Sequence, residues 1–268
     1  MAAAETPRAG GASILFIGDV VGSPGRRALL AALPGLRERH APTFVVVNGE
    51  NAAGGLGITP KIADEFFAAG IDAITLGNHT YHHREVYPYL DEEDRIVRPA
   101  NYLKSQPGHG FVVVERDGVR LGVVNLSGNL FLRAGRPAFS EIDAVLYELR
   151  DRVDHVLVDM HAEATSEKVG MGWHLDGRVT AVVGTHTHVP TADARVLPGG
   201  TAYITDVGMT GARGGVIGVK REQAIESMMS HMPVRFETAD EDPWIMAVLI
   251  RTDGALRAAS IEQILEAV

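Results

Sequence analysis

Residues 181–188 have the sequence Ala181-Val182-Val183-Gly184-Thr185-His186-Thr187-His188. The apolar, β-branched run predicts a buried strand that ends at Gly184. Two histidines follow one residue apart, and side chains two apart in extended backbone point the same way. Imidazole is the commonest protein ligand for transition metals. Taken alone, the pair is more typical of a solvated polar loop than of a metal site, so its meaning depends on the rest of the chain.

Four other apolar runs end in polar side chains in a similar way. They are Ser13–Ile17 followed by Asp19, Phe44–Val47 by Glu50 and Asn51, Asp72–Leu76 by Asn78 and His79, and His155–Val158 by His161. In open α/β sheets, sites form at the carboxyl ends of the strands. Each residue has a purely structural alternative, such as a helix cap for Asp19 or Asn51 or a core position for His161. Five such strand ends together favour a shared site.

Helical patterns separate these strands and predict β–loop–α units with right-handed crossovers. The predicted helices are Ser23–Arg39 capped by Ser23, Pro60–Gly70 after Thr59, His83–Leu90, Ser140–Arg150 capped by Ser140, one from Thr165, and Lys220–His231. Asp117-Gly118 predicts a hairpin. Further strand-like runs are Ala194–Leu197, Ala202–Thr205, Val234–Glu237, Ile245–Arg251 and Leu256–Ile261, with Asp253-Gly254 turning the last pair. We expect mixed sheets in a single domain over residues 13–268, after a disordered tail over residues 1–12.

Composition narrows the class of protein. The chain has 268 residues, a formal net charge of −9 and no cysteine. The charge disfavours a broad surface for long nucleic acid. The missing cysteines exclude disulfides and thiolate metal sites, and they fit a cytoplasmic location. No apolar run is long enough to span a membrane.

The candidate ligands offer only nitrogen and oxygen atoms. This donor set suits Mn²⁺, Fe or Zn²⁺, and the histidines argue against Ca²⁺ or Mg²⁺ alone. Without His79 there are two carboxylates, two carboxamides and three imidazoles, and these seven ligands are too many for one tetrahedral zinc. They suit two transition-metal ions that share a carboxylate, roughly 3.5–4 Å apart, which is the arrangement that clamps a phosphoryl group.

The order of these motifs resembles the calcineurin-like metallophosphoesterase superfamily. The motifs are Gly18-Asp19, Gly49-Glu50-Asn51, Gly77-Asn78-His79, His161 and Gly184-Thr185-His186-Thr187-His188. Two positions depart from that pattern: Val21 stands where a ligand histidine is usual, and Glu50 replaces the bridging aspartate. These departures closely resemble the YmdB-like bacterial phosphodiesterase subfamily, as do the runs beginning at Asn48, Arg98, His161 and Thr205.

The resemblance implies a four-layer α-β-β-α sandwich with two mixed β-sheets. It also implies a dinuclear centre of iron or manganese, in preference to zinc, and phosphodiesterase action on cyclic nucleotides, notably 2′,3′-cyclic nucleotides. Asp19, Asn51 and His188 would complete one metal site, and Asn78, His161 and His186 the other, with Glu50 shared. A metal-bridging hydroxide would attack phosphorus, and His79 would act as general acid.

Alternatives remain for the activity and for several side chains. The same centre could serve a phosphomonoesterase, or it could stabilise a regulatory or binding module with little turnover. Lys168 could contact phosphate or form a salt bridge, Asp206 could orient a ligand histidine, and Trp173 or Tyr102 could stack a base or pack in the core. Assembly into a homo-oligomer is left open.

Overall fold

The structure, a computed structural model, describes residues 11–254 and 257–268. Helices in these residues are α1 (Gly22–His40), α2 (Pro60–Ala68), α3 (Val86–Glu92), α4 (Ala138–Leu149), α5 (Thr165–Leu175) and α6 (Arg221–Ser230). The strands before α5 are β1 (Ser13–Ile17), β2 (Asp19–Val20), β3 (Phe44–Asn48), β4 (Ala73–Thr75), β5 (Ile96–Val97), β6 (Phe111–Arg116), β7 (Val119–Ser127) and β8 (His155–His161). The later strands are β9 (Ala181–Thr185), β10 (Arg195–Val196), β11 (Ala202–Ile204), β12 (Met209–Ala212), β13 (Pro243–Gly254) and β14 (Arg257–Ala267).

The strands form two mixed sheets. The first has the order β2-β12-β13-β1-β3-β4-β5, with β14 paired to β13, and the second has the order β10-β11-β9-β8-β7-β6. In the first sheet β1, β3, β4 and β5 are parallel, whereas β13 runs antiparallel to β1. In the second sheet β7, β8, β9 and β11 are parallel, and β6 and β10 are antiparallel edge strands. All parallel strands of one sheet therefore direct their carboxyl ends to one edge.

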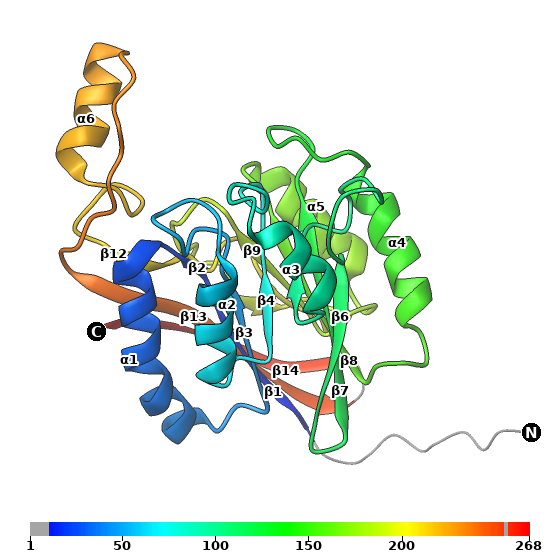
Figure 1. Cartoon of the computed structure of the whole chain (residues 1–268). Coiled ribbons are helices and arrows are strands. Elements are labelled where there is room, and N and C mark those ends of the chain that lie inside the picture. The colour runs from blue at the N-terminus through cyan, green and yellow to red at the C-terminus, as the bar shows by residue number, and fades with distance from the viewer. Residues whose placement is uncertain (1–10, 255–256) are drawn as a thin grey trace, which may run out of the picture.

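Three apolar layers hold the sheets and helices together. Successive side chains of β1 belong to two of these layers: Leu15 packs on the helical side of the sheet, and Phe16 packs between the two sheets. A third layer lies between the second sheet and α4 and α5, and contains Val158. Figure 1 shows α1 and α2 on one side of the strands and α4 and α5 on the other. The fold is the expected four-layer α-β-β-α sandwich.

The boundaries of the domain follow from the same packing. Residues 1–10 of the expected tail lie outside the described residues, but Ala12 is buried and its N–H donates to Thr252 Oγ1 over 2.8 Å. Because both sheets contribute to the middle core, we propose that residues 13–268 form a single domain. Over the described ranges, no helix is both long enough and apolar enough to cross a membrane.

Several local expectations were wrong. Residues 234–237 are irregular instead of a strand, and they belong to an arm around α6 that stands off the body of the molecule (Figure 1). Helix α1 follows Val21 and Ser23 does not cap it. Helix α4 begins at Ala138, whose N–H donates to Asn129 Oδ1, so Ser140 is not its cap. The short strands β2, β5 and β12 were not predicted. Asp253 and Gly254, expected to form the turn of the last pair, are instead the end of β13, and Leu256 of the expected last strand lies outside the described residues.

Candidate metal centre

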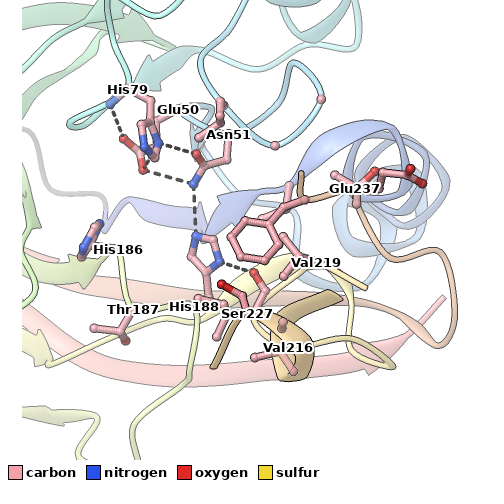
Figure 2. Close-up of a pocket in the computed structure, with 18 of the residues that line it drawn as sticks. Glu50, Asn51, His79, His186, Thr187, His188, Val216, Val219, Ser227 and Glu237 are labelled. Carbon is pink, nitrogen blue, oxygen red and sulfur yellow. Dashed lines mark hydrogen bonds and ion pairs between the residues drawn. The ribbon is translucent and has the colours of Figure 1, made fainter. Parts of the chain in front are cut away.

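The carboxyl ends of strands from both sheets meet at one place and bring the candidate residues together. Asp19 lies in β2 directly after β1, Glu50 and Asn51 follow β3, and Asn78 and His79 follow β4. From the second sheet, His161 ends β8, and His186 and His188 follow β9. Figure 2 shows Glu50, Asn51, His79, His186 and His188 around one cavity. All eight residues singled out in the sequence therefore belong to one cluster.

Four side chains of this cluster converge on one point. His161 Nε2 lies 3.0 Å from Asn78 Oδ1, 3.1 Å from Glu50 Oε1 and 3.1 Å from His186 Nδ1. Neighbouring ligands around an ion bound at about 2.1 Å are separated by roughly 3 Å. The four atoms thus have the identity and the spacing of a ligand set for a transition metal.

A second group of side chains adjoins the first through Glu50. Asn51 Nδ2 lies 3.1 Å from Glu50 Oε1 and 3.1 Å from His188 Nε2. The other ring nitrogen of His188, Nδ1, donates to the carbonyl of Ile217 over 2.8 Å. This hydrogen bond fixes the tautomer of His188 and leaves Nε2 as the atom that could bind a metal. An amide binds a cation through oxygen, so Asn51, whose Nδ2 faces Glu50 and His188 in this structure, would have to reorient its side chain to bind an ion here.

Asp19 supplies the clearest sign that a cation fits here. Its Oδ2 accepts the N–H of His186 over 3.1 Å, but its Oδ1 is buried and accepts no hydrogen bond from the described residues. Burial raises the pKa of the Asp19 carboxyl to about 6, although His188 and His161 oppose the shift. A buried carboxylate oxygen that accepts no hydrogen bond costs free energy, and a cation beside Asp19 would remove that cost.

The charge states of the neighbouring groups also suit metal binding. Burial acts to raise the pKa of Glu50, but the adjacent His161 and His79 hold it well below its ordinary value. Burial opposes a charge on His161, yet Glu50 and Asp19 raise its pKa to about 9. Burial and the nearby His161 lower the pKa of His186 to about 3. A metal ion bound at this place would displace the proton of His161.

The loop that carries the two histidines has an unusual backbone. His186 and His188 have φ angles of 97° and 66°, which non-glycine residues seldom adopt. A buried ion pair supports this turn: Lys168 Nζ donates to Asp206 Oδ2 over 2.7 Å, and the same oxygen accepts the N–H and the hydroxyl of Thr187. Lys168 therefore forms a salt bridge within the fold, and Asp206 holds the backbone between the histidines.

Replacing Lys168 with methionine should lower the free energy of unfolding by about 3–5 kcal/mol, because Asp206 would remain buried without its cationic partner. Both side chains of the pair are only 1% exposed. The midpoint of urea unfolding measures the effect. Lys104→Met, at an exposed position, is the control and should change the free energy by less than about 0.5 kcal/mol. Equal stabilities of the two variants would contradict the structural role of the pair.

Gly77 allows two of the candidate ligands to approach each other. A Cβ atom at this position would lie 2.3 Å from Glu50 Oε2 and 2.4 Å from His161 Nε2. The glycine before Asn78 is thus required by packing, because any side chain would occupy the volume of the ligand atoms.

Gly77→Ala should lower the free energy of unfolding by about 1–3 kcal/mol through overpacking, and it should reduce the bound metal to less than half of the wild-type content. Thermal unfolding and elemental analysis measure the two effects. The control is Gly35→Ala in α1, where a Cβ atom meets only Arg39 Nη1 at 3.5 Å, and where alanine should be neutral or stabilise by up to about 1 kcal/mol. Normal metal content in Gly77→Ala would show that the predicted clash is relieved.

His79 lies beside the cluster with its ring facing the cavity. Its N–H donates to Glu50 Oε2 over 3.1 Å, and its Nδ1 lies 2.8 Å from Asn51 Oδ1 and 3.4 Å from Glu50 Oε1. Because both neighbours of Nδ1 are oxygen acceptors, Nδ1 carries a proton, as the hydrogen-bond pattern assigns it. The side chain is 30% exposed, so Nε2 can reach a bound molecule.

The sequence did not single out two residues that support the cluster. Glu163 Oε2 lies 3.2 Å from His186 Nε2, on the side of the ring away from His161. Buried Asp159 accepts the hydroxyl of Thr185 over 2.6 Å, and Thr185 Oγ1 lies 2.8 Å from His161 Nδ1. The spacing of two residues between Asp159, His161 and Glu163 was the available signal. These carboxylates would orient the histidines, as is common around metal ions.

The cluster forms one wall of a cavity of about 540 Å³. Glu50, Asn51, His79, His186 and His188 line it, together with Val21 and Glu163. Tyr102 is buried and Trp173 is exposed on α5, and neither is among the lining residues. The cavity is within the volume range of sites for small molecules, roughly 300–1,000 Å³.

Comparisons with known proteins agree with this geometry. The family model described as YmdB-like protein matches residues 15–264. The chain is 47% identical to the Bacillus subtilis (strain 168) protein named 2′,3′-cyclic-nucleotide 2′-phosphodiesterase, over 94% of this chain and 96% of that protein.

The chain is also similar in fold and sequence to proteins of known structure. A structure described as a novel phosphatase from Mycoplasma pneumoniae has a TM-score of 0.89 at 33% identity, covering 97% of this chain and 95% of that one. A hypothetical protein from Thermus thermophilus has a TM-score of 0.89 at 41% identity, covering 95% of this chain and 99% of that one. The fold alone extends to a Staphylococcus aureus putative 5′-nucleotidase, with a TM-score of 0.62 at 15% identity, covering 95% of this chain and 54% of that one.

Proposed function

This chain belongs to the YmdB-like protein family, and we propose from that premise that it is a metal-dependent phosphodiesterase acting on 2′,3′-cyclic nucleotides. The observation that carries the proposal is the convergence of Asn78, Glu50 and His186 on Nε2 of His161. Nitrogen and oxygen ligands in this arrangement support metal-assisted hydrolysis of a phosphate ester. The name of the Bacillus subtilis relative supports a cyclic nucleotide as the substrate.

Two transition-metal ions would be held in adjoining sites. Asp19, Asn51 and His188 would bind one ion, Asn78, His161 and His186 the other, and Glu50 would bind both. We propose iron or manganese in preference to zinc. The buried Oδ1 of Asp19, which accepts no hydrogen bond from the described residues, supports the first site, and the donor atoms around His161 support the second. When bound, such ions lower the pKa of water and stabilise charge on phosphoryl oxygens.

The protein's own groups would position the substrate and move the proton. We propose that His79 gives the proton on Nε2 to the ribose oxygen that leaves phosphorus, as a general acid. Asn51 and Glu50 hold the ring through Nδ1. Glu163 and Ile217 would keep the rings of His186 and His188 in their orientations.

Charge favours a diester over a monoester. Two divalent ions, the carboxylates of Asp19 and Glu50 and one hydroxide sum to about +1, which a phosphodiester monoanion neutralises. The test is a parallel assay of 2′,3′-cyclic AMP and of p-nitrophenyl phosphate with the same enzyme. Preferential turnover of the cyclic nucleotide supports the proposal, and turnover of the monoester alone would establish a phosphomonoesterase instead.

The cellular setting is also a proposal. The absence of cysteine supports a cytoplasmic location, and the net charge of −9 disfavours long nucleic acid as a partner. We propose that the chain forms a homo-oligomer, because Met229 and Met232 of the arm are 79% and 64% exposed and solvent-exposed apolar groups favour association. Multi-angle light scattering would give the mass as a multiple of 28.7 kDa.

A further inference from the structure

The cavity has a second wall that contains no candidate ligand. It is formed by the arm, residues 213–240, which projects from the body around α6 (Figure 1). Apolar side chains dominate this wall, and they are Val216, Ile217, Val219, Ala224, Met228 and Phe236. Figure 2 shows Val219 and Glu237 on the side of the cavity away from His186. One cavity therefore joins a polar, ligand-bearing half to an apolar half.

Hydrogen bonds at the base of the arm give the apolar half a defined shape. The N–H of Val216 donates to the carbonyl of Val219 over 2.8 Å, and the N–H of Val219 donates back over 3.0 Å. The N–H of Ala239 donates to the carbonyl of Gly218 over 2.9 Å, which joins the two chain segments of the arm. Because Ile217 also accepts the hydrogen bond of His188, the apolar wall has a defined position relative to the candidate metal centre.

Two large side chains of this wall are exposed although they are apolar. Phe236 is 51% exposed and Met228 is 67% exposed, so a molecule that covered them would gain free energy from the burial of apolar surface. Aromatic rings pack favourably against other planar rings, and methionine sulfur makes favourable contacts with aromatic rings. The polar groups nearby in the lining are few, namely Ser227, Glu237 and Thr238, which is typical of a pocket for a mainly flat, apolar group with polar edges.

We propose that the arm forms the nucleobase subsite, in which Phe236 and Met228 pack against the base of the cyclic nucleotide while its phosphate faces the metal centre. This inference rests on the proposed function and adds the residues that would distinguish a nucleotide from other cyclic phosphates. Every base has an apolar face, so contacts of this kind tolerate all four bases. The subsite would therefore select for the presence of a base and only weakly for its identity.

The test compares two substrates that differ only in the base: 2′,3′-cyclic AMP and ribose 2′,3′-cyclic phosphate. Phe236→Ala should raise KM for the nucleotide roughly tenfold and leave kcat within about twofold, because the lost contact acts equally on the bound substrate and the transition state. Both constants for the base-free substrate should stay within about twofold of wild type. The matched control is Phe131→Ala, which removes a phenylalanine that is 71% exposed and does not line the cavity.

Two results would overturn the subsite. Unchanged KM for the nucleotide would show that the base does not contact Phe236. An equal loss on both substrates would show that the arm acts only by supporting His188. Calorimetric binding of adenosine monophosphate and ribose phosphate to wild type and to Phe236→Ala separates this inference from the proposed function. Base-dependent binding without turnover would support the subsite and contradict the proposed phosphodiesterase activity. Turnover of the nucleotide that does not depend on Phe236 would support the activity and contradict the subsite.

Discussion

Glu50→Gln should lower kcat/KM for a 2′,3′-cyclic nucleotide by at least about 1,000-fold and reduce bound metal to less than one equivalent per chain. Glu50 contacts both groups of candidate ligands, since its Oε1 lies 3.1 Å from His161 Nε2 and 3.1 Å from Asn51 Nδ2. Glutamine has the same shape but no negative charge, and an amide is a poorer ligand for two cations. Loss of a residue that only orients a ligand already costs about 10- to 100-fold in metal affinity.

Elemental analysis and steady-state kinetics on the same preparations measure this effect. The control is Glu148→Gln in α4, an exposed glutamate that should change neither quantity. Glu50→Gln protein that keeps two equivalents of metal and full activity would exclude Glu50 as a shared ligand.

His79→Asn should lower kcat/KM for the cyclic nucleotide by roughly 100- to 10,000-fold, the usual contribution of a general acid, while leaving the metal content unchanged. The ribose oxygen is a poor leaving group and needs a proton. A p-nitrophenyl phosphodiester has a better leaving group, so its hydrolysis should fall by less than about tenfold in the same variant.

The comparison of the two substrates distinguishes proton transfer from a general disturbance of the site. His40→Asn at the end of α1, outside the cavity, is the matched control and should behave as wild type. An equal loss on both substrates would argue that His79 positions Glu50 and is not the acid. If the cellular effect of the protein survives in a His79→Asn strain that lacks turnover, the protein is a regulatory module.

The gathering of the site was predictable because it follows from the pattern of the strands. Short apolar runs are followed by Asp19, Glu50, Asn78 and His186. These side chains come together when the strands are parallel and share one carboxyl edge. The length of the runs and the helical patterns between them predicted such parallel strands. The packing of the two sheets brings His161 at the end of β8 against Glu50, which follows β3. This arrangement depends on contacts between distant segments and was not predictable from spacing.

The missed features have specific physical causes. Strand β12 contains a glycine, and β2 and β5 have only two residues each, so neither period nor length marked them. Val234 and Phe236 alternate as in a strand, but this segment has no neighbouring strand in the described residues and Phe236 lines the cavity instead. Glu163 is exposed on a loop, and only its contact with His186 shows its importance.

The central claim is that Glu50, Asn78, His161 and His186, with Asp19, Asn51 and His188, bind two transition-metal ions. Anomalous diffraction from crystals of protein purified without added metal, recorded across the iron, manganese and zinc absorption edges, gives the number, identity and position of such ions. We expect two peaks about 3.5–4 Å apart, both within bonding distance of Glu50. A single peak, or two peaks of which one has no contact with Glu50, would contradict the account.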